Sequence, residues 1–231
     1  MRETLKLPQR LANVTTEARA DKPDDLATIT GYAAVYWKAG DKGTEYQLAP
    51  DMVERIMPGA FKTAVADDDA RAMLNHDPAF MLGRTSSGTA RFFEDATGLR
   101  FEIDPPNTEA GRTAVELIGR GDIDGASFQF LAAGRAKRGR IVWIEEKDDE
   151  GRMIDIREVH DLELFEGGPV DFPAYAGTSA QLRSQQHIEQ LEAERRQLRR
   201  REMTETEAVA IMQMRGRAVA ANQRLLGFPR K

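Results

Sequence analysis

One serine of the chain follows a turn rich in glycine and aspartate and opens an apolar strand pattern. Within residues 121–130, Gly-Asp-Ile-Asp-Gly favours a turn, because glycine tolerates unusual backbone angles and aspartate bonds to nearby amides. The following Ala-Ser-Phe-Gln-Phe alternates apolar and polar residues with the period of two that is typical of a strand. The alternation predicts that Ser127 points away from Phe128 and Phe130, toward a surface or a cleft.

A serine becomes a useful nucleophile only when a base accepts its proton and a third group holds that base. The chain has 3 histidines, His76, His160 and His187. His76 lies at the polar end of a predicted strand, at a corner closed by Pro78, and such strand ends often hold catalytic groups. His187 lies in a highly charged stretch, where a solvated surface residue is expected. His76 is therefore the candidate base for Ser127.

Two residues are candidates for the group that orients this base. His160 follows the alternation of a leucine-rich strand pattern, so it fits equally well as a histidine at the edge of a core face. The same alternation places Glu166 beside an apolar face, where a carboxylate needs a partner such as a histidine. From spacing alone, a glutamate that points to water at the end of a strand is the plainer interpretation. Ser127, His76 and Glu166 nevertheless fit the roles of a triad, with His160 as the substitute for the third.

Other chemistries lack their characteristic residues. The sequence contains no G-x-S-x-G elbow, no Walker loop and no H-E-x-x-H motif. It has no cysteine, which excludes disulfides, thiolate chemistry and the usual structural zinc sites. A metal-dependent hydrolase around His76 and Asp77 would have to rely on scattered carboxylates. We therefore expect neither a metal nor another cofactor.

The charge pattern offers little basis for binding nucleic acid or a membrane. The net charge is only −5, and the basic loop Arg135–Arg140 is close in sequence to the acidic loop Glu145–Glu150, which suggests two solvated hairpin ends. No apolar run reaches the length of a membrane span. Residues 1–10 lack the apolar core of a signal peptide. We expect a soluble, cytoplasmic protein.

The elements that would position these residues fall into three regions. Residues 1–26 are a polar lead-in with room for one short strand, residues 27–181 alternate strand patterns with glycine-rich turns, and residues 182–231 form a charged helical extension. The middle region predicts about seven strands and two or three helices, an α+β protein built as a mainly antiparallel β-barrel or sandwich with peripheral helices. The clearest expected elements are strands over 90–94, 98–103 and 157–165, a helical turn at 52–56, and helices over 60–65 and 109–119.

Several stretches, in their order along residues 31–180, together resemble the prohead (capsid-maturation) protease family of tailed bacteriophages. They are Gly31-Tyr-Ala-Ala-Val-Tyr36, Met57-Pro-Gly-Ala-Phe61, Leu74-Asn-His-Asp77, Leu82-Gly-Arg-Thr-Ser-Ser-Gly-Thr89, Gly98-Leu99, Leu117-Ile-Gly-Arg-Gly-Asp-Ile123, Gly125-Ala-Ser-Phe-Gln-Phe130 and Leu164-Phe-Glu-Gly-Gly-Pro-Val-Asp-Phe-Pro-Ala-Tyr175.

The resemblance implies a serine endopeptidase with a herpesvirus-protease-like fold, a β-barrel surrounded by helices. It implies that His76 is the base and Ser127 the nucleophile, and Glu166 matches the family's acidic position. Related herpesvirus assemblins use a second histidine as the third member, which keeps His160 as the alternative.

Two stretches depart from the family pattern. Gly167-Gly168 replaces the usual Val-Ser after the glutamate, and Ala126 and Gln129 replace two positions of Met-Ser-Phe-Gly-Phe. Neither departure removes a proposed catalytic group.

The expected function is therefore proteolysis during capsid assembly, in the host bacterial cytoplasm and inside the assembling procapsid. The resemblance implies the major capsid protein, its scaffolding segment and the protease itself as substrates, and self-association is expected. The extension at 182–231 would tether the enzyme inside the procapsid or be cut away. The competing class is a non-enzymatic scaffolding or assembly protein.

Overall fold

A computed structural model describes residues 14–17, 26–132, 137–171, 191–198 and 200. The chain divides into two compact units, residues 1–184 and 185–231. In the second unit, residues 191–198 are helical. All residues of the candidate site that the structure describes belong to the first unit.

The described residues of the first unit form twelve strands, two α-helices and three short 3-10 helices. In chain order these are β1 (Thr15–Glu17), β2 (Thr28–Val35), η1 (Lys42–Thr44), β3 (Glu45–Ala49), β4 (Met52–Ile56), α1 (Lys62–Asp67), β5 (Arg71–Met73), η2 (Pro78–Phe80), β6 (Met81–Arg84), η3 (Thr85–Ser87), β7 (Ala90–Glu94), β8 (Gly98–Ile103), α2 (Glu109–Arg120), β9 (Gly125–Leu131), β10 (Arg140–Lys147), β11 (Met153–Asp161) and β12 (Glu163–Val170).

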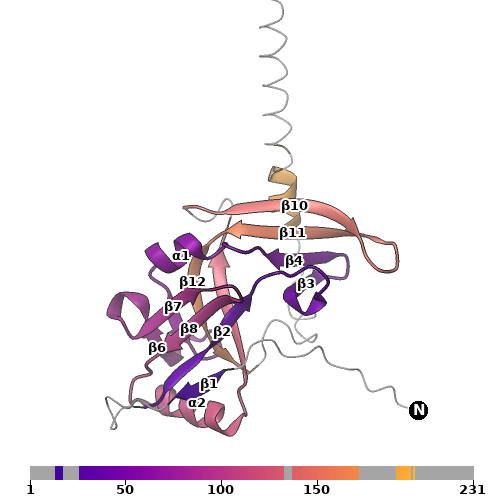
Figure 1. The fold of residues 1–231 in the computed structure, drawn as a ribbon. Helices are drawn as coiled ribbons and strands as arrows, with labels where there is room; N and C mark the ends of the chain where they lie inside the picture. Colours follow the sequence, from indigo (N-terminus) through magenta and orange to yellow (C-terminus); the bar gives the residue numbers. More distant parts are fainter. Residues whose placement is uncertain (1–13, 18–25, 133–136, 172–190, 199, 201–231) are drawn as a thin grey trace, which may run out of the picture. The chain divides into compact units, whose positions relative to one another are not determined.

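The strands make three four-stranded sheets, in the orders β1-β2-β8-β7, β10-β11-β4-β3 and β6-β5-β12-β9 (Figure 1). Most neighbours are antiparallel, whereas β11–β4 and β12–β5 are parallel. The predicted α+β class with mainly antiparallel strands is confirmed. The expected number of about seven strands was too low, because pieces as short as β1 and β5 show no alternation that a sequence pattern could detect.

Several predicted elements are confirmed, with small changes at their ends. The strands over 90–94 and 98–103 are β7 and β8, and the two helices expected after residue 60 are α1 and α2. The hydroxyl of Thr108 caps α2 by accepting a hydrogen bond from the Gly111 amide. One short strand, β1, lies within the lead-in as expected.

Two predictions were wrong. Residues 52–56 form strand β4 rather than a helical turn, because β4 is buried along its length and hydrogen bonds to β11 and β3 on its two sides. The single strand expected over 157–165 is divided at Leu162 between β11 and β12, which belong to different sheets. The chain changes sheets at this residue, whose side chain is completely buried.

The core of the first unit is apolar. Its largest fully buried side chains include Phe61, Phe101, Leu99 and Ile156, and their removal from water stabilises the fold. Within the described part of the chain, no helix is long and apolar enough to cross a membrane.

Candidate active site

Ser127 lies on β9, an edge strand of the sheet β6-β5-β12-β9. The aromatic ring of Phe128, the next residue, has its centroid 5.4 Å from that of Phe61 and 6.3 Å from that of Tyr46. Because neighbouring residues of a strand point to opposite faces, these ring contacts assign Ser127 to the other face. The predicted orientation is therefore correct, but Ser127 is only 8% exposed, so the residue is buried.

Glu166 shares the face of Ser127. Strands β9 and β12 are antiparallel, with Ser127 opposite Gly168 and Gln129 opposite Glu166. Residues directly opposite one another lie on the same face of a sheet, as do residues two apart in one strand. Ser127, Gly168 and Glu166 therefore line one face, and Glu166 is completely buried there.

His76 is held at a strained corner that follows β5. Asn75 and His76 have φ angles of 56° and 58°, the left-handed region that non-glycine residues rarely adopt. Such conformations cost on the order of 1–3 kcal/mol each, and they persist only when the surroundings impose them. Here the Asn75 amide N–H donates to the carbonyl of Pro169 at 3.0 Å.

A reciprocal side-chain contact secures the same corner. The Asn75 side-chain amide donates to an Asp171 carboxylate oxygen at 2.9 Å, and the Asp171 main-chain N–H donates to the Asn75 side-chain oxygen at 2.8 Å. Asp171 directly follows β12, the strand of Glu166. The corner and the strand of the carboxylate are thus fastened to each other.

The corner brings His76 to Glu166, 90 residues away in sequence. His76 Nδ1 is in hydrogen-bond contact with Glu166 Oε2, and the imidazole is 26% exposed. The Nδ1 contact leaves Nε2 as the ring nitrogen that can exchange a proton with another group. Glu166 Oε1 is buried and has no hydrogen-bond partner within the described residues.

Gly168 allows the backbone of Met73, at the end of β5, to lie close to this face of β12. A Cβ atom on residue 168 would lie 2.5 Å from the carbonyl oxygen of Met73 and 3.4 Å from Glu166 Oε1. A side chain there would push back the end of β5 and the His76 corner that follows it. A Cβ on Gly167 would lie 3.0 Å from Phe92 Cε1. Close packing against the backbone therefore requires a glycine at position 168, whereas a Cβ at position 167 would require a small shift of the Phe92 ring.

The other candidate residues lie in different surroundings. His160 is on β11 in a separate sheet, where its Nε2 is 3.0 Å from Glu158 Oε2. Asp77 caps η2 by accepting a hydrogen bond from the Ala79 amide. Within the described residues, no group of three or more His, Cys, Asp or Glu side chains could hold a metal ion. His187 lies outside the described residues.

Sequence reasoning missed the residues that support the site, although weak signals existed. Asn75 precedes His76, and asparagine tolerates left-handed angles better than most residues. A pair of glycines inside a strand pattern indicates close approach of another backbone. Nothing in the sequence connected Asn75 to Asp171, because that contact joins distant segments.

Comparison with known families identifies the family of the chain. The family model described as caudovirus prohead serine protease matches residues 14–193, which is most of the chain and includes every described candidate residue. No curated protein and no solved structure matches the chain. On the strength of the family match, the chain belongs to the caudovirus prohead serine proteases.

Proposed function

We propose that the protein is the serine endopeptidase of prohead maturation and that Ser127, His76 and Glu166 are its catalytic residues. The observation that carries the proposal is the contact between His76 Nδ1 and the buried Glu166 carboxylate, on the face of the sheet that Ser127 shares. His160 is a weaker third member, because its ring contacts Glu158 in a different sheet.

In the proposed reaction, His76 Nε2 accepts the Ser127 hydroxyl proton as the serine oxygen attacks the scissile carbonyl. The tetrahedral intermediate collapses when His76 returns that proton to the leaving amine, which leaves an acyl-enzyme. A water molecule, deprotonated by His76, then releases the acyl group and regenerates Ser127. Glu166 keeps the proton on Nδ1 in the resting state and stabilises the imidazolium that forms.

The burial of Glu166 gives this role its strength. A carboxylate removed from water is costly unless it is paired, so it favours a cationic partner. When His76 accepts the serine proton, the buried carboxylate gains a cationic partner. This stabilisation increases as positive charge develops on the imidazole, which lowers the barrier to proton transfer.

The proposal extends to the substrates and the setting. Family membership supports protein substrates in the capsid, and we propose the major capsid protein, its scaffolding segment and the protease itself, cleaved inside the procapsid in the bacterial host. The proposal includes self-association, a protease domain over 27–181, the herpesvirus-protease-like barrel, and a tethering or removable extension at 182–231.

The test is Ser127→Ala in cells that co-express the capsid protein, with Ser86→Ala as the matched control. Ser86 is an exposed serine of η3, away from β9. We expect Ser127→Ala to abolish both capsid-protein cleavage and labelling by a fluorophosphonate, while Ser86→Ala retains both. Unchanged cleavage by Ser127→Ala would overturn the assignment. Absence of labelling in the unmodified protein would favour the scaffolding class.

A further inference from the structure

The register of β12 contains a bulge next to Glu166, between that residue and Leu164. Leu164 is opposite Phe130, but Glu166 is opposite Gln129, so Phe165 is an extra residue in β12. If the register of Leu164 with Phe130 continued without a bulge, Phe165 would be opposite Gln129 and Glu166 opposite Phe128. Phe128 points to the face away from Ser127, so the bulge joins the register at Leu164 to the register that Glu166 shares with Ser127.

Asp68 holds the strand at this bulge. Leu164, the residue before the bulge, donates its main-chain N–H to Asp68 Oδ2 at 2.7 Å. Asp68 directly follows α1 and precedes β5, whose only pairing with β12 joins Arg71 to Glu166. The Asp68 carboxylate therefore takes the place of a strand carbonyl where β5 has not yet begun.

Arg138 fixes the Asp68 side chain in turn. The two terminal guanidinium nitrogens of Arg138 contact the two carboxylate oxygens of Asp68, one of them at 2.8 Å. The neighbouring Lys137 donates its main-chain N–H to Glu163 Oε2 at 3.0 Å. Since the Asp68 side chain is only 9% exposed, this forked ion pair keeps its direction well defined.

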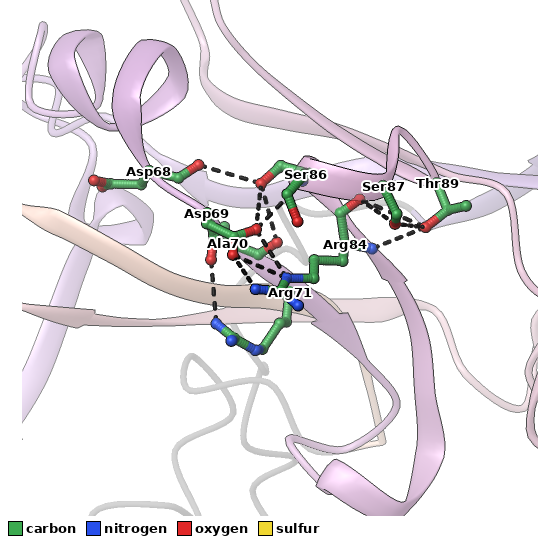
Figure 2. Close-up of polar contacts among 9 residues, drawn as sticks. Asp68, Asp69, Ala70, Arg71, Arg84, Ser86, Ser87 and Thr89 are labelled. Carbon is green, nitrogen blue, oxygen red and sulfur yellow. Dashed lines mark hydrogen bonds and ion pairs between the residues drawn. The ribbon is translucent and has the colours of Figure 1, made fainter.

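Asp69, the next residue, faces the opposite way and provides a contrast. Figure 2 shows its carboxylate beside Arg84 and Ser86, whereas the Asp68 side chain points away from this group. The Arg84 guanidinium holds the pKa of the Asp69 carboxyl well below its usual range. Asp69 thus anchors the chain to β6 and η3: among the described residues, its carboxylate is hydrogen-bonded to Arg84, Thr85 and Ser86, none of which belongs to β12.

We propose that Asp68 is a positioning residue of the protease: by holding Leu164 it maintains the bulge at Phe165, and the bulge presents Glu166 to His76. This inference rests on the proposed roles of Ser127, His76 and Glu166. It adds a group, clamped by Arg138, that acts without touching the substrate.

The test compares Asp68→Ala with Asp69→Ala in the full-length protein. Two quantities are measured: the rate of fluorophosphonate labelling at Ser127 and the downfield proton signal of the His76 Nδ1–H in the NMR spectrum. The chain has only 3 histidines, so His76→Gln assigns that signal. We expect Asp68→Ala to slow labelling about 100-fold and to remove the downfield signal, because small misplacements of a catalytic group have effects of this size. Asp69→Ala should change neither.

A conservative variant separates positioning from general damage to the fold. Asp68→Asn keeps one oxygen acceptor for the Leu164 amide, so labelling should recover to within about tenfold of the unmodified protein. If Asp68→Ala does not fold, Asp68→Asn is compared with Asp69→Asn, and only the former should be slower. The inference would be overturned if the Asp68 and Asp69 variants were labelled at the same rate, or if the His76 signal were unchanged in Asp68→Ala. Because the NMR signal does not depend on catalysis, it tests Asp68 even if Ser127→Ala shows that the proposed function is wrong.

Discussion

The molecule contains two histidine–carboxylate pairs that differ in how they are built. His160 and Glu158 are two residues apart on β11, and alternation along one strand is enough to place them on the same face. His76 and Glu166 come from a loop corner and a different strand. Glu158 keeps 16% of its side chain exposed, whereas Glu166 has none exposed.

This difference shows what the proposed catalytic pair has beyond its residue types. The local pair needs no special backbone, and solvent weakens its electrostatic interaction. The distant pair is surrounded by two left-handed residues, the contact with Asp171, a glycine where two backbone segments pass close together, and a strand bulge. Strain of this kind persists where the surroundings impose it, and it is concentrated at functional sites.

The largest expected effect comes from replacing the two histidines separately. His76→Gln should lower the rate of peptide cleavage by on the order of 10⁴-fold or more, since it removes the proposed base. His160→Gln should leave the rate within about twofold. Cleavage of purified capsid protein, followed by gel electrophoresis, measures both. Comparable losses in the two variants would remove the distinction between the pairs.

The carboxylates provide the next test. Glu166→Gln should lower the cleavage rate about 10²- to 10⁴-fold, because the amide cannot stabilise the imidazolium or hold the required tautomer. Glu158→Gln should cleave like the unmodified protein. Single-turnover labelling of Ser127 isolates the acylation step. A Glu158→Gln defect that exceeded the Glu166→Gln defect would favour His160 and its partner as the functional pair.

The smallest expected effect concerns the glycine beneath the His76 corner. Gly168→Ala should destabilise the fold by about 1–3 kcal/mol, because its Cβ would meet the Met73 carbonyl oxygen and the chain must move. It should also slow Ser127 labelling. Gly119→Ala is the control: a Cβ there has no atom within 4 Å, and alanine in α2 should stabilise by about 0.5–1 kcal/mol. Urea unfolding measures both changes. Equal changes in the free energy of unfolding for the two variants would contradict the close contact between Gly168 and the Met73 backbone.

How far the sequence predicted the site depends on the range of each signal. The turn before Ser127 and the strand that contains it are local patterns, and both were predicted correctly. The single alternation drawn from His160 to Glu166 was misleading, because β11 and β12 lie in different sheets. Residues 52–56 were assigned to a helix for a similar reason, since the partners that make them a strand are far away in sequence.

The stretch from residue 121 to residue 130 determined by itself a turn, a strand, and a serine on the face of that strand away from the phenylalanines. The ordered motifs determined the family, which the family model confirms. Only the tertiary structure decided that Glu166 contacts His76, that Asn75 is hydrogen-bonded to Asp171, and that a bulge separates Leu164 from Glu166. The physical reason is that register and chain crossing depend on pairing between distant strands, and a shift of one residue would turn every side chain to the other face.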